Sequence, residues 1–293
     1  MKVLMTGASG FLGRHVVKVL QSQGIEVVAI GRATPPSGVQ LIKADLLNTP
    51  NLDQLVQQVQ APFLLHFAWY TEHGKYWDSP LNLRWSDATT RLVEAFCFGG
   101  GRHVVVSGTC AEYDWDHAYC QEDSTPLTPR TLYGTAKDAT RRLTMAICAQ
   151  HQVSCAWGRV FFPYGLGESP SRLIPSLIDA FRGDREPFGV NAKAFRDFLH
   201  ADDVAHGLVT LLTRNANGAY NLCSGEPTRL AEVVTTLASL LGVDPGPILA
   251  RTTDRPGEPP LLFGESTKLR ALGWEPTLTL SQGLARTIQG DAS

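Results

Sequence analysis

Short apolar runs alternate with amphipathic stretches over the first half of the chain. Each run has the length and continuous hydrophobicity of a strand buried on both faces, and the runs are Val3–Met5, Val27–Ile30, Phe63–Leu65, Val104–Val106 and Ser154–Phe161. The stretches between them carry apolar residues at helical spacing and predict helices over Gly10–Gln23, Leu52–Val59, Ser86–Phe98 and Tyr133–His151. This alternation predicts an α/β fold of the doubly wound Rossmann type, with a parallel sheet covered by helices on both faces.

The pattern changes after residue 160, where prolines and glycines break the chain into shorter pieces. They cluster at Phe162–Gly165, Gly183–Asp184, Pro245–Pro247 and Arg255–Pro260. We therefore predict a dinucleotide-binding Rossmann domain over residues 1–160 and a smaller α/β lobe over residues 161–293 that binds substrate. Part of this second segment is expected to cross back to the Rossmann sheet.

Composition and charge exclude several classes of protein. The chain has 293 residues, of which 43% are hydrophobic, so it can bury a sizeable core. Its 26 basic and 28 acidic residues give a net charge of -2, so no overall field attracts nucleic acid or an anionic membrane. The sequence has neither the pattern of a signal peptide nor an apolar stretch that spans a bilayer, and we expect a cytoplasmic protein.

The cysteines lie far apart and form none of the spacings that bind zinc or mark a redox pair. They are Cys97, Cys110, Cys120, Cys148, Cys155 and Cys223. We expect buried free thiols in a reducing compartment, and no metal site.

A glycine-rich turn follows the first predicted strand and opens the first predicted helix. It reads Thr6-Gly7-Ala8-Ser9-Gly10-Phe11-Leu12-Gly13. Gly7 allows a tight turn, Gly10 lets backbone N–H groups approach a diphosphate, and Gly13 permits close packing of the helix on the sheet. The positive end of the helix dipole then faces the phosphates. The pattern predicts a dinucleotide site made by Gly7, Ser9, Gly10, Phe11, Leu12 and Gly13.

The end of the second strand bears on the choice of cofactor. An NAD enzyme usually places a carboxylate there for the ribose hydroxyls, whereas this chain reads Gly31-Arg32. The Arg32 guanidinium can pair with a 2′-phosphate, so NADP is favoured over NAD, although an exposed loop arginine would look the same. After the third strand, Asp45-Leu46 is placed to cap the adenine edge, or Asp45 is an ordinary turn residue.

Tyr133 and Lys137 stand four residues apart, on one face of the helix that starts there. A nearby ammonium favours phenolate, so we expect a lowered pKa for Tyr133 and proton exchange with a substrate oxygen near neutral pH. The strand Val104–Thr109 ends upstream in hydroxyl residues, and Thr109 is placed to hydrogen-bond the same oxygen. The three residues form a candidate catalytic set.

Taken together, the chain resembles an extended short-chain dehydrogenase/reductase of the nucleotide-sugar epimerase, dehydratase and reductase group. The resemblance covers nearly the whole chain, because its motifs fall in family order. They are the glycine-rich turn, Asp45-Leu46, His66-Phe67-Ala68, the strand end at Thr109, the Tyr/Lys pair, Arg196-Asp197-Phe198 and Asp202-Asp203-Val204.

The resemblance implies roles for several residues. Tyr133 exchanges the proton, Lys137 also holds the nicotinamide ribose, and Thr109 orients the sugar oxygen, while Phe67 and Ala68 border the cofactor. A nucleotide-diphosphate sugar lies between the lobes, where Arg196 and Arg255 match arginines that hold the diphosphate and Leu173 matches the segment lining the nucleotide pocket. Fold analogy further implies a homodimer through the helices Ser86–Phe98 and Tyr133–His151.

Several positions depart from the family pattern. Dehydratases of the group carry Asp-Glu after the catalytic threonine, and here those positions are Cys110-Ala111, which disfavours elimination. Glu112 is a feature of resembling reductases or a structural residue, and Cys110 is offset by one from the cysteine of some relatives. Phe162 and Trp85 replace asparagines, and with Trp69, Tyr70, Tyr76 and Trp77 they form core packing or an apolar wall suited to a deoxygenated sugar. His66, His73 and His200 are further acid-base candidates without a family role.

These features favour an NADPH-dependent reductase of a nucleotide-linked 4-keto-6-deoxyhexose, with Trp69 and Phe162 in the substrate site. The alternative is a nucleotide-sugar 4-epimerase with tightly bound NAD, which uses the same residues twice. A third, less favoured hypothesis is a non-catalytic NADP-binding scaffold.

Overall fold

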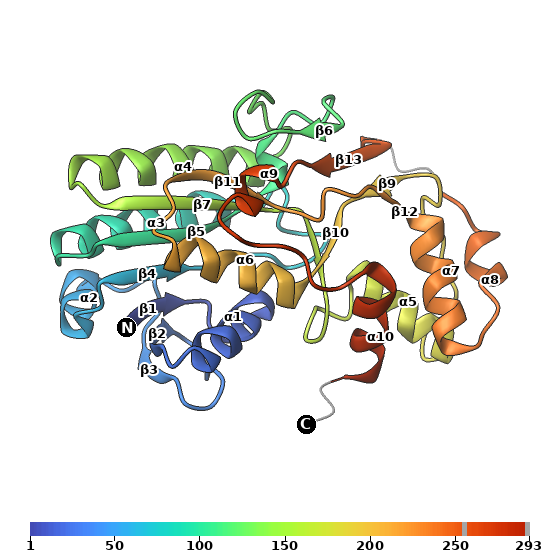
Figure 1. Cartoon of the computed structure of the whole chain (residues 1–293), viewed down its shortest axis with the longest axis horizontal. Coiled ribbons are helices and arrows are strands. Elements are labelled where there is room, and N and C mark those ends of the chain that lie inside the picture. The colour runs from blue at the N-terminus through green and yellow to red at the C-terminus, as the bar shows by residue number, and fades with distance from the viewer. Residues whose placement is uncertain (254–256, 291–293) are drawn as a thin grey trace.

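A seven-stranded parallel sheet forms the centre of the molecule (Figure 1). The computed structural model describes residues 1–253 and 257–290. The sheet order is β11-β7-β5-β4-β1-β2-β3. These strands are β1 (Lys2–Thr6), β2 (Glu26–Gly31), β3 (Gln40–Lys43), β4 (Phe63–His66), β5 (His103–Thr109), β7 (Ser154–Val160) and β11 (Gly218–Leu222). The predicted Rossmann sheet is confirmed.

Helices cover both faces of this sheet. On one face lie α1 (Phe11–Ser22) and α6 (Ala201–Thr213), and on the other lie α2 (Leu52–Val59), α3 (Leu81–Phe98) and α4 (Leu132–Gln150). Because successive side chains of a strand point to opposite faces, Val3 and Met5 join the cluster with α1 and α6, whereas Leu4 joins the cluster with α2 and α3. This is why the strands are continuously apolar.

The helix α3 begins five residues earlier than the sequence pattern indicates, at Leu81 and not at Ser86. Pro80 precedes it, and Asn82 and Trp85 in its first turns are buried. Asn82 donates to the Tyr76 carbonyl and accepts from the Trp69 indole, so a polar residue occupies an interior position. A count of apolar residues alone misses such a turn.

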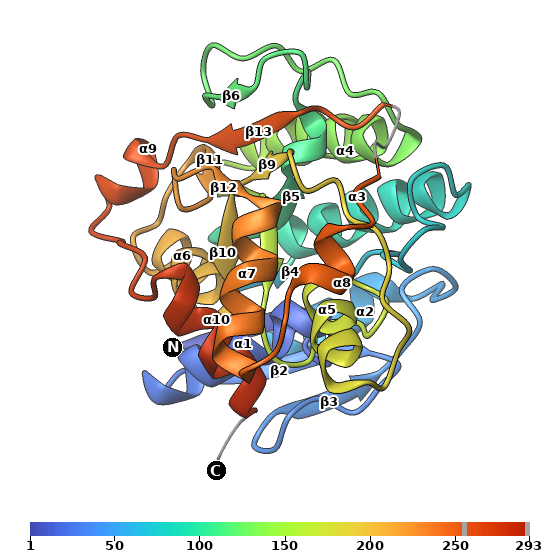
Figure 2. The ribbon, with the colours of Figure 1, turned by 90° about the vertical axis from the view of Figure 1, so that its right-hand side faces the viewer.

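A second lobe packs beside the sheet and has its own apolar core. Figure 2 shows its helices α5 (Leu173–Arg182), α7 (Leu230–Leu241), α8 (Gly246–Leu249) and α10 (Leu280–Gln289). Short strands border the lobe in two small sheets, ordered β12-β9-β13-β6 and β10-β8. They are β6 (Tyr119–Cys120), β8 (Phe162–Tyr164), β9 (Phe195–Arg196), β10 (Phe198–His200), β12 (Thr228–Arg229) and β13 (Leu261–Gly264), with the short helix α9 (Thr267–Arg270) following β13.

The chain crosses between the two lobes more than once. After β7 it enters the second lobe through β8 and α5, returns for α6 and β11, and leaves again for α7. β11 pairs with β7 and forms the edge of the central sheet. The lobes are therefore interwoven, and the groove between them borders the carboxyl ends of the central strands.

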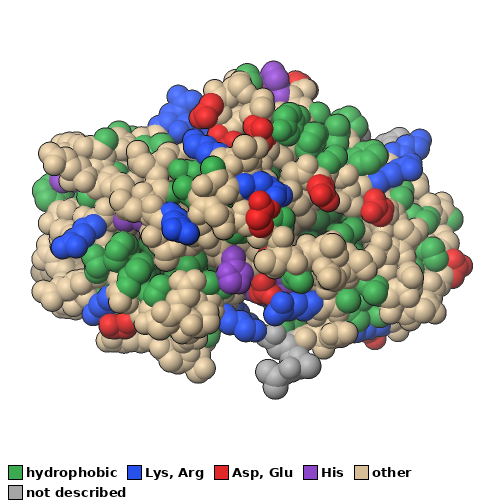
Figure 3. Space-filling model, viewed as in Figure 1, with side chains coloured by type: hydrophobic (Ala, Val, Ile, Leu, Met, Phe, Trp, Pro, Cys, Tyr) green, Lys and Arg blue, Asp and Glu red, His purple; other side chains and the backbone are tan. Residues whose placement is uncertain are grey.

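The surface of the molecule carries charged side chains of both signs (Figure 3). Basic and acidic side chains are interspersed on the face shown in Figure 3. Within residues 1–253 and 257–290, every helix is too short or too polar to span a bilayer, and no three metal-ligating side chains cluster.

All six cysteines are free and buried, which confirms the prediction of buried thiols.

Candidate active site

A cavity of about 1060 Å³ opens between the lobes, at the carboxyl ends of β1, β2, β4 and β5. This is the point where the strand order reverses, the usual place for ligands in such sheets. Every predicted site residue that the structure describes lines it. They are Gly7, Ser9, Gly10, Phe11, Leu12, Gly13, Gly31, Arg32, Asp45, Leu46, Phe67, Ala68, Trp69, Thr109, Tyr133, Lys137, Phe162, Leu173 and Arg196. Arg255 lies outside the described residues.

The glycine-rich turn has the shape of a diphosphate cradle. Gly7 has a φ of +73°, and a Cβ there would lie 2.9 Å from the Ala68 nitrogen. A Cβ on Gly13 would overlap the Gly7 carbonyl oxygen, so both positions exclude side chains. Within the described chain no side chain caps the N-terminus of α1 at Gly10, which leaves first-turn N–H groups facing the cavity. These residues fit a dinucleotide phosphate group.

At the far end of the cavity, Arg32 is exposed after β2, and the space around Gly31 is open. Asp45 also lines this end. Its carboxylate accepts the Leu47 N–H at 3.1 Å and the Asn48 amide at 2.7 Å, so it holds its own turn as well.

Tyr133 and Lys137 lie at the start of α4, whose first turn is fixed from both sides. The Thr131 hydroxyl accepts the Gly134 N–H at 3.1 Å, and the Tyr133 N–H donates to the Trp77 carbonyl at 2.8 Å. Lys137 donates to the Ser107 carbonyl at 2.8 Å, at the end of β5 that also carries Thr109. Strand and helix thus bring the three predicted catalytic side chains to one wall of the cavity.

The pKa values of this pair differ from the expectation. Burial and Tyr76 raise the pKa of Tyr133, and a hydrogen bond with Thr109 opposes the rise. Burial lowers the pKa of Lys137 to about 7, opposed by Glu112. The expected lowering of the phenol pKa is therefore wrong, because burial in this apolar wall has the largest effect on Tyr133. Tyr133 stands in the site as a protonated phenol.

Behind Thr109, Glu112 is the centre of a buried hydrogen-bond network. Its carboxylate accepts the Thr109 N–H, the Trp157 indole N–H and the Arg159 Nε–H, each at 2.8 Å. Arg159 also donates to the Tyr113 hydroxyl at 2.9 Å. Glu112 is fully buried. This network fixes the end of β5 and gives Glu112 a structural role, one of the two roles that the sequence left open.

Cys110, His66 and His200 show features of structural residues. Burial raises the pKa of the Cys110 thiol, and its neighbours include Tyr113 and Phe161. His66 bridges the hydroxyls of Thr6 and Thr89 at 2.7 and 2.9 Å.

Burial lowers the pKa of His66 to about 3, so it is neutral. His200 accepts the Asp202 N–H at the start of α6. Of the three histidines, His73 lines the cavity.

The aromatic residues form a wall that is both core and cavity lining. Trp69 stacks on Trp85 with ring centroids 6.5 Å apart, and the Lys137 Nζ lies 4.1 Å from the Trp69 ring centroid. Tyr76 packs edge-on against Tyr133 at 4.8 Å, and Trp77 packs against the same ring at 5.8 Å. All of these residues also line the cavity.

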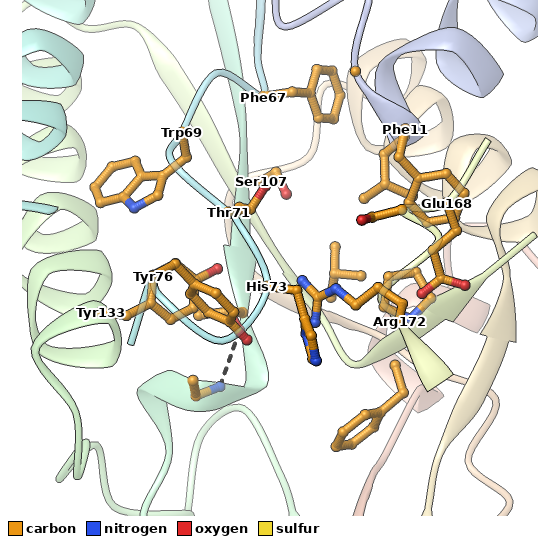
Figure 4. Close-up of a pocket in the computed structure, with 18 of the residues that line it drawn as sticks. Phe11, Phe67, Trp69, Thr71, His73, Tyr76, Ser107, Tyr133, Glu168 and Arg172 are labelled. Carbon is orange, nitrogen blue, oxygen red and sulfur yellow. Dashed lines mark hydrogen bonds between the residues drawn. The ribbon is translucent and has the colours of Figure 1, made fainter. Parts of the chain in front are cut away.

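The opposite wall comes from the second lobe (Figure 4). Arg172 reaches across the cavity, and its guanidinium carbon lies 5.3 Å from the Tyr76 ring centroid. Glu168 lies between Arg172 and Phe11. Neither residue was predicted from the sequence, since both stand in a loop without a recognised motif. Arg196 is buried and donates to the Phe195 and Pro259 carbonyls, each at 2.8 Å, so it also ties the loop after α8 to β9.

Fold and cavity together define the class, an extended short-chain dehydrogenase/reductase. Within it, the chain belongs to the NAD dependent epimerase/dehydratase family, whose model matches residues 3–223. It is therefore an enzyme of the nucleotide-sugar epimerase, dehydratase and reductase group.

Individual relatives are named for different activities on nucleotide sugars. The structure of MoeE5 in complex with UDP-glucose and NAD is 31% identical, with a TM-score of 0.86 over 99% of this chain and 98% of that one. The UDP-glucose 4-epimerase of Azospirillum brasilense is 27% identical, covering 98% and 90% of the two chains. The dTDP-6-deoxy-L-talose 4-dehydrogenase (NAD(+)) of Aggregatibacter actinomycetemcomitans is 27% identical, covering 80% and 88%. Among such relatives, epimerases are named more often than 4-keto reductases.

Proposed function

We propose that the protein is an NADPH-dependent reductase of a nucleotide-linked 4-keto-6-deoxyhexose. The observation that carries this proposal is the aromatic wall around a protonated Tyr133. Because the phenol holds its proton in the free protein, it can donate that proton to a carbonyl oxygen that gains negative charge. An apolar wall suits a sugar carbon that has lost its hydroxyl.

The residues at the end of β5 and the start of α4 have separate roles in the proposed reduction. A bound nicotinamide would supply the hydride that the keto carbon receives. Tyr133 gives its hydroxyl proton to the oxygen that gains negative charge, and Thr109 hydrogen-bonds the same oxygen. Lys137 would hold the cofactor ribose, and its protonated form would favour the phenolate that remains after the proton has left.

Two neighbours of Thr109 count against dehydration. Elimination of water needs groups that hold and deliver protons at this position, and Cys110 and Ala111 stand there. Burial keeps the Cys110 thiol protonated, since it raises the thiol pKa.

We propose NADPH as the cofactor because Arg32 lies exposed beside the open space around Gly31. A 2′-phosphate in that space would meet a guanidinium and no carboxylate of β2. The MoeE5 structure holds NAD, so NADH is the competing cofactor against which this proposal is to be tested.

The segment 161–293, apart from α6 and β11 that return to the central sheet, is proposed to bind the nucleotide sugar. Arg196 and Leu173 line the cavity on this side, Phe162 adds an apolar surface, and Arg255 is proposed as a second diphosphate contact. The uridine diphosphate of the MoeE5 complexes makes UDP-sugars the first substrates to test.

A nucleotide-sugar 4-epimerase with tightly bound NAD is the second candidate, favoured by the epimerases among the relatives. The two activities differ in cofactor balance. A reductase consumes NADPH in proportion to product, which lowers the absorbance of the reduced nicotinamide. An epimerase interconverts two sugars without net change in that absorbance, and this result would promote the second candidate.

A homodimer through α3 and α4 is also proposed. These helices pack side by side and expose large apolar side chains at Leu83, Phe98 and Leu143. Light scattering on the purified protein should give twice the chain mass, and Leu83→Glu should shift it to the single-chain mass. A monomer in the unmutated protein would contradict the proposal.

A further inference from the structure

The loop between β8 and α5 is fastened to the dinucleotide half of the molecule. His15 of α1 donates from Nε2 to the Leu166 carbonyl at 2.9 Å, and its Nδ1 lies 2.6 Å from the Asp202 carboxylate. The Glu168 N–H donates to the Gly165 carbonyl at 3.3 Å within the same loop. Glu168 is thus held in place beside the glycine-rich turn.

One carboxyl oxygen of Glu168 has no partner. Within the described residues, Oε2 is buried and makes no hydrogen bond. The buried Asp197 carboxylate is different, since it accepts from the Ser224 N–H and hydroxyl and from the Gly225 and Gly264 N–H groups at 2.6 to 3.2 Å. A buried oxygen without a donor is unusual in a folded chain. Thr144 Oγ1 and His200 Nε2 also lack a partner among the described residues, but of the three residues Glu168 lines the cavity, so a ligand there can supply its missing partner.

Glu168 lies in the part of the cavity where phosphates are expected. It lines the same cavity as the glycine-rich turn, and Figure 4 places it beside Phe11 and across from Tyr133. A charged carboxylate at this place would repel a diphosphate. A neutral carboxyl would offer an O–H donor instead.

Burial of Glu168 favours the neutral form, against the effect of the neighbouring cation. Burial raises the pKa of Glu168 to about 8, and Arg172 opposes the rise. The other titratable and charged groups on the packed elements include His15 on α1, Arg185 beside α5, His200 and Asp202 at the start of α6, and Arg286 on α10, and those across the cavity include His73, Lys137 and Tyr133. None of these supplies a hydrogen bond to Oε2.

We propose that Glu168 binds the dinucleotide as a neutral carboxylic acid, donating its proton in a hydrogen bond to a diphosphate oxygen, so that cofactor binding takes up one proton at this residue. This inference rests on the dinucleotide site of the proposed function. No covalent bond changes, and the proton comes from solvent.

The sign of the pH effect follows. Below pH 8 most of the free protein already carries the proton, so affinity for the cofactor is nearly constant. Above pH 8, one proton must bind together with each dinucleotide. The affinity for the cofactor then decreases with rising pH, and the decrease approaches about tenfold per pH unit. About half a proton is taken up at pH 8.

The test is calorimetry of NADPH and NADH binding to the full chain near pH 8, in two buffers that differ in ionisation enthalpy. The difference in apparent binding heat gives the number of protons taken up. In Glu168→Gln, the number of protons taken up at pH 8 should fall by about half a proton. Above pH 8, the cofactor affinity of this variant should decrease less steeply with rising pH than that of the unmutated protein, by up to about tenfold per pH unit. Lys137, His15 and His200 remain in both proteins, so the difference between them isolates Glu168.

Glu94→Gln on the exposed face of α3 is the matched control and should behave like the unmutated protein. Cofactor binding with equal proton uptake in the unmutated protein and in Glu168→Gln would overturn this inference alone. Failure of both NADPH and NADH to bind the unmutated protein at pH about 6.5 would instead overturn the dinucleotide site, and this inference with it. The wild-type measurement needs no variant, and the absence of any proton uptake there would also refute the role of Glu168.

Discussion

Two carboxyl groups stand on opposite sides of the cavity, Glu112 behind the β5 wall and Glu168 on the loop after β8. Glu112 receives three hydrogen bonds of 2.8 Å from Thr109, Trp157 and Arg159. Glu168 has an oxygen that receives none from the described residues. Glu112 is fully buried, whereas Glu168 is half-buried and its Oε2 atom is buried, so the two carboxyl groups differ in their partners as well as in their exposure.

The contrast shows how the site divides its tasks. The wall with Thr109, Tyr133 and Lys137 is complete within the chain, so its geometry is set before any ligand arrives. The wall with Glu168 and Arg172 leaves hydrogen-bonding capacity for something else. Changes in the first wall should therefore damage turnover or stability, and changes in the second should affect binding.

The largest expected effect is on turnover. Tyr133→Phe removes only the hydroxyl, so the fold and cofactor binding should survive while the proton donor is lost, and kcat should fall by about 10²–10⁴. Lys137→Met should be at least as damaging, because it removes the charge beside the phenol. Steady-state turnover of the reduced cofactor measures both. Tyr119→Phe, on an exposed tyrosine stacked on Phe263, is the control, and near-normal turnover of Tyr133→Phe would refute the assigned mechanism.

The next effect is on stability. Glu112→Ala leaves Arg159 buried without its carboxylate partner, and the free energy of unfolding should fall by about 3–5 kcal/mol. Urea denaturation measures this. Glu168→Ala should lose far less, because its Oε2 makes no hydrogen bond within the described residues. Equal losses at the two sites would break the comparison between the walls.

A smaller effect concerns the choice of cofactor. Arg32→Ala should narrow the difference in binding free energy between NADPH and NADH by about 1–3 kcal/mol, the value of a charge-assisted hydrogen bond. Titration of each cofactor, followed by fluorescence, gives the difference. Arg91→Ala on α3, which removes a surface ion pair with Asp87, should leave it unchanged. Equal affinities for the two cofactors in the unmutated protein would rule out the proposed role of Arg32.

The smallest effect is expected on the second wall. Arg172→Gln should raise KM for the nucleotide sugar up to about tenfold, since it removes a cation that faces the cavity, while kcat stays nearly constant. Initial rates over a range of sugar concentrations separate the two parameters. A fall in kcat without a change in KM would show that Arg172 acts in the chemical step, as proposed for the wall with Tyr133 and Lys137.

Most of the central sheet was predictable because its strands are buried on both faces and read as unbroken apolar runs. The glycine-rich turn, Thr109 and the Tyr133/Lys137 pair could be found for a related reason, since each is a short motif at the end of such a run. β11 was not predicted as a strand, because its place beside β7 depends on pairing between segments far apart in the sequence. Asn82 is polar in sequence and interior in the fold.

Glu168 shows a different limit. Glutamate is common in loops, and Glu168 stands out only because no described residue donates a hydrogen bond to its Oε2, which cannot be read from the sequence. The pKa of Tyr133 was wrongly predicted for a comparable reason, because the aromatic rings that bury it come from a separate loop that includes Tyr76 and Trp77.

The placement of β11 at the edge of the sheet limits how the gene can be divided. A fragment that ends near residue 160 would keep β7 but lose the strand that covers its outer edge, and an uncovered apolar edge strand promotes aggregation. The same fragment would lose α6, which packs against α1. The two lobes are therefore not exchangeable modules, and swapping substrate lobes between relatives would require transplanting loops such as the one after β8 into an intact chain.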